Sequence, residues 1–509
     1  MTIVLPHGVL FRGGEEGEIR KNLIENNHID AIIGLPANIF FGTGIPTIIM
    51  VLRQKRENTD VLIIDASKGF IKEGKNNKLR ASDIKRIADT FIKRESIPKF
   101  SRVVSREEIR SNDYNLNIPR YVDSSEAAEH WDVYASMFGG IPTAEIDEMS
   151  EFWTAFPALK KALFTESGIP YVNVSTSDIR SAIKSHPDVV GFENAFNAAF
   201  STFPAFLKEE LIDRMGSIEI SKAETVLSAD IFERLKEIPL IDKYAAFQLL
   251  DDDWTGISID LEMLQTEGFA ATKKVDPNLV IKKKDGKDQE VQEGWVGHII
   301  PFDLVQATLL SAETDELHGL ESRLAEIPSE YESILDEMTE EDKESCNDVL
   351  TEEGDAFVPK EVSKKIKELK KDRSPESVAL RTLLEKVESL VKSEKEIKAE
   401  IKAKSAALQA KTKDTIESLN DEQALDLLEK KWIAPLIESI HKLPDTVIDS
   451  LVSKIQALQN KYATTFFEVE QQISETEATL SGMIDDLEGN EYDMLGLNEL
   501  KKLLGGSAE

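Results

Sequence analysis

Two short apolar runs with a loop between them constrain the fold more than any other part of this chain. Residues 28–35 and 47–52 are too short for helices and rich in β-branched side chains, so they predict two buried strands. The loop that joins them contains two Phe, two Gly and two Pro. Because binding residues usually lie on loops at the ends of buried strands, we expect a functional site here.

The sequence around this loop alternates strands with helices. We expect strands at 2–5, 28–35, 47–52 and 61–65 and helices at 15–26 and 81–94. This order predicts an α/β sheet. The strands on either side of the loop can be antiparallel, because their connection is too short for a crossover helix. The chain opens directly on a strand, so we expect the sheet to be the second half of a larger one.

The remainder of the 509 residues is expected to be mainly helical. Asp285-Gly286 between two strand-like runs signals a β-hairpin. Heptad-spaced apolar residues further on predict coiled-coil helices. The predicted division is an α/β domain at 1–110, an extended polar connector at 111–125, a mainly helical domain at 126–301 with a β-hairpin near 278–300, a coiled-coil helical hairpin at 302–415, and a C-terminal helical segment at 416–509.

Charge is distributed unevenly along the chain, whose net charge is -33. Residues 1–125 contain 20 Lys or Arg and 16 Asp or Glu, whereas the remainder contains 41 and 78. An acidic surface repels a polyanion, so we expect the chain alone to bind nucleic acid poorly. If it acts on DNA, a partner or the short basic portion must supply the phosphate contacts.

The apolar runs fall short of the roughly 18 residues that cross a bilayer, so we expect a cytoplasmic protein without a membrane partner. The single cysteine, Cys346, excludes a disulfide framework and a cysteine-rich zinc site. It lies in an acidic stretch and is expected to be solvated. The seven His have no ligand spacing, so no metal site is expected.

The loop between the two apolar strands offers a place for a planar ligand to stack. Phe40 and Phe41 cannot both face the core while the backbone stays extended, so one ring is expected to project into a cleft. Gly42 and Gly44 allow close approach of a ligand, and Pro46 helps to shape the loop. A nucleobase can stack on the exposed ring. The alternative is a simple turn between strands.

The clearest basic patch of the acidic region surrounds the predicted β-hairpin. Its members are Lys273, Lys274, Lys282, Lys283 and Lys284. These side chains are candidates for phosphate contacts. The alternative is a solvated hairpin tip.

Residues 3–123 resemble the second half of the catalytic domain in type I restriction-modification methyltransferase (M) subunits. These enzymes transfer a methyl group from S-adenosylmethionine to the exocyclic amino group of adenine in DNA. The resemblance rests on five segments in family order, which are Leu5–Gly14, Glu18–Lys21, Gly34–Phe40, Gly42–Pro46 and Tyr114–Tyr121. It implies a Rossmann-like methyltransferase sheet in which Phe40 stacks on the flipped-out target base, with Phe41 as the second choice.

Two motifs of the family are not found in these 509 residues. They are the Gly-rich cofactor loop and the Asn-Pro-Pro-aromatic tetrapeptide that grips the target amino group. The resemblance therefore implies that this chain is the C-terminal part of a split or truncated M subunit. We expect no catalytic residue in it, no S-adenosylmethionine binding by it alone, and no activity alone.

The resemblance also implies partners. These are a specificity subunit, a restriction subunit in the full complex, and DNA within that complex. The heptad helices between Leu317 and Leu480 suit docking on long helices of the specificity subunit; alternatively, they pack only on one another. A second hypothesis is a non-enzymatic assembly module that docks a specificity subunit or complements a separate N-terminal half.

Overall fold

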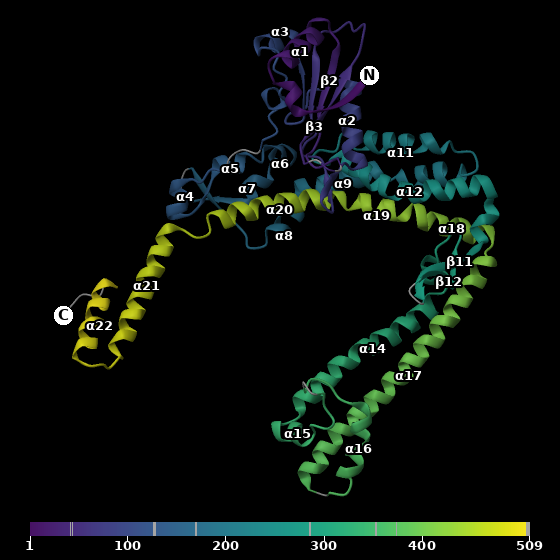
Figure 1. Ribbon diagram of the computed structural model, residues 1–509, viewed down its shortest axis with the longest axis vertical. Helices are drawn as coiled ribbons and strands as arrows, with labels where there is room; N and C mark the ends of the chain where they lie inside the picture. Colours follow the sequence, from purple (N-terminus) through teal and green to yellow (C-terminus); the bar gives the residue numbers. More distant parts are fainter. Residues whose placement is uncertain are drawn as a thin grey trace. The chain divides into compact units, whose positions relative to one another are not determined.

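A mixed five-stranded sheet forms the N-terminal part of the protein in the computed structural model (Figure 1). The structure describes residues 1–40, 42, 44–125, 129–167, 170–284, 287–351, 354–372 and 374–504. The sheet strands are β1 (Thr2–Pro6), β2 (Ile29–Gly34), β3 (Thr47–Leu52), β4 (Val61–Asp65) and β7 (Ser101–Val104). Their order across the sheet is β1-β3-β2-β4-β7.

The strand directions place three strand ends at one edge of the sheet. β3 is antiparallel to both β1 and β2, and β2 is parallel to β4. The prediction that the strands flanking the loop are antiparallel is therefore confirmed. β1, β2 and β4 all point the same way, so the loops that follow them emerge at the same edge.

Helices cover both faces of this sheet, because its strands bury alternate residues on opposite sides. Ile32 and Ile63 face a core with Ile24 of α1 (Glu15–Glu25) and Ile109 of α3 (Arg106–Ser111). Ile33 and Ile64 face the other side, together with Ile87 of α2 (Ala81–Lys93). Every residue of β2 and β4 is buried, which fits their continuous apolar sequence.

The structure differs from the sequence-based expectation at two places in this region. A small ribbon of β5 (Ile71–Glu73) and β6 (Asn76–Lys78) was not predicted, since its strands are short and mostly polar. The segment at 111–125, expected as an extended connector, contains the short 3-10 helix η2 (Ile118–Arg120). Leu116 and Tyr121 of this segment are buried in the sheet core, because its apolar residues cover the open end of that core.

Contacts divide the chain into two units. Unit 1 comprises Met1–Ala205, Ser221–Thr255 and Leu436–Glu509, and unit 2 comprises Phe206–Ile220 and Gly256–Pro435. The five-part division expected from the sequence stays a prediction. The other elements that lie wholly or mostly in unit 1 are η1 (His7–Leu10), α4 (Val133–Phe138), β8 (Ile141–Pro142), α5 (Thr143–Asp147), α6 (Ser150–Ala155), α7 (Leu159–Leu163), β9 (Phe164–Glu166), β10 (Tyr171–Val174), α8 (Ile179–Lys184), α9 (Pro187–Phe200), α10 (Phe203–Leu207), α11 (Ile220–Arg234), α12 (Lys243–Glu267), α19 (Ala434–His441), α20 (Leu443–Lys461), α21 (Phe466–Asp485) and α22 (Glu491–Leu503).

Unit 2 contains the predicted hairpin and the heptad helices. Its elements are η3 (Lys208–Asp213), η4 (Phe269–Lys273), β11 (Val275–Lys284), β12 (Lys287–Gly297), α13 (Phe302–Leu309), α14 (Ser311–Glu337), α15 (Glu340–Ser345), α16 (Pro359–Leu369), α17 (Pro375–Glu417) and α18 (Asp421–Trp432). β11 and β12 confirm the two strands of the hairpin; its turn at Asp285-Gly286 lies outside the described residues.

The two long heptad helices of unit 2 pack on each other. Leu317 near the start of α14 lies with Leu408 near the end of α17, and Ile334 lies with Leu384. The helices are therefore antiparallel, as the hairpin prediction requires, and a coiled-coil geometry stays a prediction. Cys346 is fully buried beside them, contrary to expectation, because its segment folds back onto the helix pair.

In the part of the chain that the structure describes, every helix is too short or too polar to span a membrane. Within the same residues, no three His, Cys, Asp or Glu side chains gather as a metal site would require.

Candidate functional site

The candidate site lies at the sheet edge where β1, β2 and β4 end. His7 follows β1, the loop with Phe40 follows β2, and Asp65 ends β4. Ligands of α/β sheets commonly bind outside the carboxyl ends of parallel strands. Burial lowers the pKa of His7, although Asp65 opposes the shift. An imidazole in this position is therefore neutral over a wider pH range than a solvated one.

The loop after β2 presents an aromatic ring to solvent. Phe40 is 41% exposed, whereas Leu35 and Pro36 at the start of the loop are buried. Gly42 has a φ of +79°, a left-handed conformation that favours glycine. Pro46 is partly buried just before β3. Phe41, the second stacking candidate, lies outside the described residues.

Hydrogen bonds from the β5–β6 ribbon brace this loop. The Asn77 side chain donates to the Ala37 carbonyl at 2.7 Å, and the Asn77 backbone N–H donates to the Asn38 carbonyl at 2.9 Å. Gly44 lies so close to Asn38 that an added Cβ would come within 3.0 Å of the Asn38 Oδ1. The loop that carries Phe40 is thus held by two hydrogen bonds from Asn77. Sequence reasoning missed Asn77, because nothing in a polar strand signals a contact forty residues away.

The Asp65 carboxylate connects the end of β4 to the segment that leaves the sheet near residue 124. The Ser67 backbone N–H donates to Asp65 Oδ1 at 3.0 Å, and the Ser124 hydroxyl donates to Asp65 Oδ2. Gly34 lies beside the same chain, where an added Cβ would come 2.6 Å from Ile118 Cδ1. A larger residue at position 34 would therefore require the Ile118 side chain to shift.

The Arg20 side chain joins three segments and was also missed. It is buried and donates to the carbonyls of Tyr114, Val9 and Arg12 at 2.8, 2.7 and 2.9 Å. These bonds connect α1 to the segment after β1 and to the segment near residue 114. Three of the five motif segments quoted above therefore meet at one guanidinium, which gives them a structural role.

The region that contains this sheet is similar to known proteins. A family model for N-6 DNA methylases matches residues 1–130. The MpnII type I restriction enzyme methylase subunit of Mycoplasma pneumoniae is 39% identical over 133 residues, and the MjaVII methylase subunit of Methanocaldococcus jannaschii is 42% identical over 137. The N-terminal region of this chain is therefore similar to part of the methylase subunits of type I restriction enzymes.

The match to these methyltransferase subunits is partial. It covers 26% of this chain and 24% of each of the two relatives, so the chain spans about a quarter of their length. A type I restriction-modification methyltransferase subunit of Streptococcus thermophilus, known from its crystal structure, is 56% identical over 25% of this chain and 26% of its own, with a TM-score of 0.24.

The lysines outside the methyltransferase region are mostly paired with carboxylates. Lys273 contacts Asp421 and Lys274 contacts Glu267, each at 2.6 Å, and Lys282 forms an ion pair with Glu293. Lys283 is exposed on the β11–β12 ribbon, and the side chain of Lys284 lies outside the described residues. Most of the positive charge expected to meet phosphate is thus already neutralised within unit 2.

At the base of this ribbon, His298 lies between two carboxylates. Its Nδ1 is 2.6 Å from Asp276 Oδ2 and its Nε2 is 3.1 Å from Glu267 Oε1. The hydrogen bond to Asp276 raises the pKa of His298, and Glu267 adds to the shift. The His298 interactions therefore stabilise the ribbon fully below the unfolded-state pKa and stop doing so as pH rises through the higher folded-state pKa.

We expect the first residues of β11 to be better protected from hydrogen exchange at mildly acidic pH than at alkaline pH, after correction for the intrinsic exchange rate. His298→Asn should abolish this pH dependence in β11. The protection of β2 should depend on pH in the same way in His298→Asn as in the unchanged protein. A β11 protection that is equally dependent on pH in His298→Asn would contradict the assignment.

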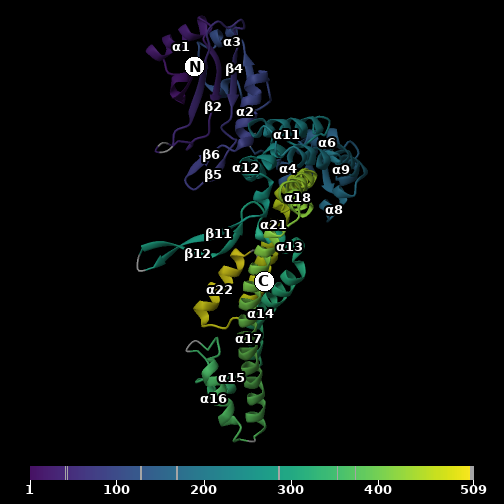
Figure 2. The same ribbon diagram turned by 90° about the vertical axis from the view of Figure 1, so that its right-hand side faces the viewer.

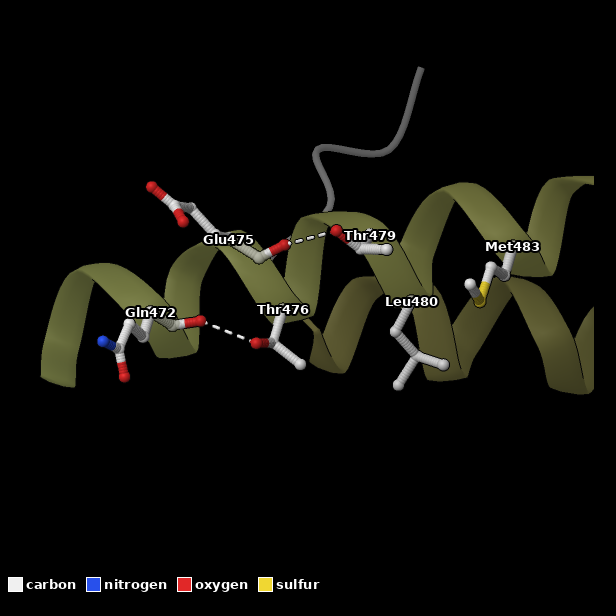
Figure 3. A pocket seen from close by; sticks show the side chains of 6 residues that line it. All are labelled: Gln472, Glu475, Thr476, Thr479, Leu480 and Met483. Atoms are coloured by element: carbon white, nitrogen blue, oxygen red, sulfur yellow. Dashed lines mark hydrogen bonds between the residues drawn. The ribbon is translucent and has the colours of Figure 1, made fainter. Parts of the chain in front are cut away.

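The C-terminal helix α21 exposes an apolar stripe. Val469, Ile473, Leu480 and Met483 repeat at helical spacing and are 38%, 53%, 44% and 62% exposed. Figure 3 shows the C-terminal part of α21, where Leu480 and Met483 line a shallow groove with polar neighbours that include Thr476. Unlike the heptad residues of α14 and α17, these side chains lie on the surface of the described chain.

Proposed function

We propose that this chain supplies the base-stacking half of the catalytic domain of an adenine-specific type I DNA methyltransferase. In this proposal Phe40 stacks on the target adenine after the base leaves the duplex. The residues that bind S-adenosylmethionine lie outside these 509 residues, so the chain alone is inactive. A specificity subunit selects the DNA site, and a restriction subunit joins the full complex.

The exposed ring of Phe40 is the observation that carries the proposal. An aromatic residue between two buried strands would ordinarily turn into the core, since burying a Phe side chain is favourable by about 1.5 to 3 kcal/mol. Phe40 instead remains 41% exposed on a loop held by Asn77. A braced, solvent-facing ring at the carboxyl edge of a sheet suits stacking on an extruded base.

The open side of β1 supports the view that further strands complete the sheet. β1 pairs with β3 on one side and ends the order of the described strands. Its residues Ile3 and Val4 are 38% and 50% exposed. An exposed apolar edge strand is ready to pair with another strand. A polypeptide that carries the cofactor motifs can pair its strands with the free side of β1.

We propose no S-adenosylmethionine site among the described residues. The carboxylate of Asp65 already accepts hydrogen bonds from Ser67 and Ser124. The space beside Gly8, after β1, is filled by the Arg12 guanidinium, which an added Cβ would meet at 2.7 Å. We therefore assign no step of methyl transfer to these groups.

Co-expression tests the proposal. We expect adenine methylation when the chain is combined with a specificity subunit and a polypeptide that carries the Gly-rich cofactor loop and the Asn-Pro-Pro-aromatic tetrapeptide. Omitting either this chain or the added polypeptide should abolish methylation. Methylation by the added polypeptide and specificity subunit without this chain would contradict it.

We further propose that the apolar stripe of α21 docks on a helix of the specificity subunit. Residues 466–503 contain ten Asp or Glu and two Lys. The complementary helix is therefore expected to carry an apolar stripe flanked by Lys or Arg. The packing of α14 on α17 favours α21 over those helices as the docking surface.

We expect Ile473→Asp with Leu480→Asp to abolish co-purification with the specificity subunit, because two charges would enter the apolar contact. The fold should survive, since both side chains are exposed. Val226→Asp, a matched change at a 46% exposed position of α11, should leave co-purification intact. Retained binding of the double variant would show that the stripe is not the docking surface.

The alternative function is a non-enzymatic assembly module. The exposed α21 stripe supports it as well, because docking does not require Phe40. If the co-expressed partners never yield methylation while the specificity subunit still binds, the assembly module is the better description.

A further inference from the structure

We propose that the β5–β6 ribbon is the DNA-backbone contact of the candidate site, gripping phosphates of the strand beside the extruded base. This inference rests on the proposed function of Phe40. It assigns the phosphate contacts to Lys68, Lys72 and Lys75. The ribbon projects from the sheet edge that carries the Phe40 loop (Figure 2).

The ribbon is basic in a chain that is otherwise acidic. Residues 68–80 contain four Lys and one Arg against one Glu. Lys78 pairs with Glu73 at 3.1 Å, and Arg80 pairs with Asp83 at 3.0 Å. Lys68, Lys72 and Lys75 are exposed, and among the described residues they have no carboxylate partner. Unneutralised lysines on an exposed two-stranded ribbon match the charge of a sugar-phosphate backbone.

The strand register of the ribbon places one of these lysines close to the loop that carries Phe40. Lys72 lies directly opposite Asn77 in the β5–β6 pair. Asn77 in turn holds the carbonyls of Ala37 and Asn38, two to three residues before Phe40. Neighbouring strands are about 4.8 Å apart, so Lys72 is one strand spacing from a residue that fixes the loop. A phosphate bound by the ribbon would therefore position the nucleotide whose base meets the ring.

The competing basic ribbon, β11–β12, is less suited to this contact. Lys282 is paired with Glu293, and the lysines near the base of that ribbon, Lys273 and Lys274, are paired with Asp421 and Glu267. Binding DNA there would require those ion pairs to break. If β5–β6 is the DNA contact, lysine substitutions there should change the salt dependence of DNA binding, and lysine substitutions in β11–β12 should not.

The test measures binding of the full chain to a labelled duplex with one unpaired adenine, as a function of salt concentration. Each phosphate contact contributes about 0.9 to the slope of log affinity against log salt. Lys72→Ala with Lys75→Ala should lower the magnitude of the slope by about 1.8, the loss of two contacts. Lys282→Ala with Lys283→Ala, the matched control on the other ribbon, should leave it unchanged.

A second readout separates this inference from the proposed function. The preference for the duplex with unpaired adenine over a fully paired duplex should fall in Phe40→Ala and in Asn77→Ala, and Asn77→Ala should keep the salt slope. If the Lys72 and Lys75 variant keeps its slope, or the chain does not bind the duplex at low salt, the ribbon assignment is overturned. If Phe40→Ala keeps the preference for unpaired adenine while the Lys72 and Lys75 variant loses part of its salt slope, the stacking proposal fails and the ribbon assignment stands.

Discussion

Phe40→Ala is expected to lower adenine methylation by the reconstituted enzyme roughly fivefold to 150-fold. Stacking of a base on an aromatic side chain contributes about 1 to 3 kcal/mol, and about 1.4 kcal/mol corresponds to a factor of ten in rate. Without the ring, the energy needed to extrude the base is no longer offset. The measurement is methyl incorporation into a duplex with one target site, under conditions that report kcat/KM.

Three comparisons make this prediction specific. Phe40→Trp should retain most of the activity, because tryptophan also offers a planar ring. Phe138→Ala, at a 59% exposed aromatic residue of α4, should have no effect. The loss in Phe40→Ala should shrink on a duplex whose target adenine is already unpaired, since extrusion then costs less. An equal loss on both duplexes would argue for a structural role of Phe40.

Asp30→Ala is expected to destabilise the sheet by about 3 to 5 kcal/mol, the range for breaking a buried ion pair by removing one partner. Asp30 at the start of β2 is 1% exposed. Its Oδ1 lies 3.1 Å from Arg56 Nε and 2.8 Å from Arg94 Nη1. Burial lowers the pKa of Arg56, and Asp30 opposes that shift. Removing this carboxylate leaves a buried guanidinium without its main counter-charge.

Hydrogen exchange of the β2 and β4 amides measures this effect locally, which suits a chain with more than one unit. Protection in these strands should fall strongly in Asp30→Ala. Glu438→Ala, which breaks an exposed pair with Lys442, should not change it. Unchanged protection of β2 in Asp30→Ala would mean that the arginines find other partners and that the cluster does not hold the sheet.

The parts of the fold that sequence predicted were those governed by local pattern. The apolar runs predicted the strands β2 and β3, and the short connection between these strands predicted their antiparallel pairing. Asp285-Gly286 predicted the β11–β12 hairpin. The β5–β6 ribbon escaped notice because its strands are only three residues long and contain a single apolar residue, Ile71. Its importance comes from the Asn77 hydrogen bonds to the Phe40 loop, and no local pattern encodes a contact of that kind.

The same reason explains why the ion pairs were not predicted and why the burial of Cys346 was predicted wrongly. Lys273 looked like a free phosphate contact, yet its partner Asp421 lies 148 residues away in the sequence. Cys346 looked solvated among acidic neighbours, yet the fold of its segment turns it into the core between α14 and α17. Ion pairs and burial that depend on distant segments become visible only in the folded chain.

The most direct test of the central proposal is to locate the extruded base by photo-crosslinking. The target adenine of the duplex is replaced by iodouracil in an unpaired position, the reconstituted complex is irradiated, and the crosslinked residue is identified by mass spectrometry. The account predicts a crosslink to Phe40 that is lost in Phe40→Ala. A crosslink confined to residues outside the loop between β2 and β3 would contradict it.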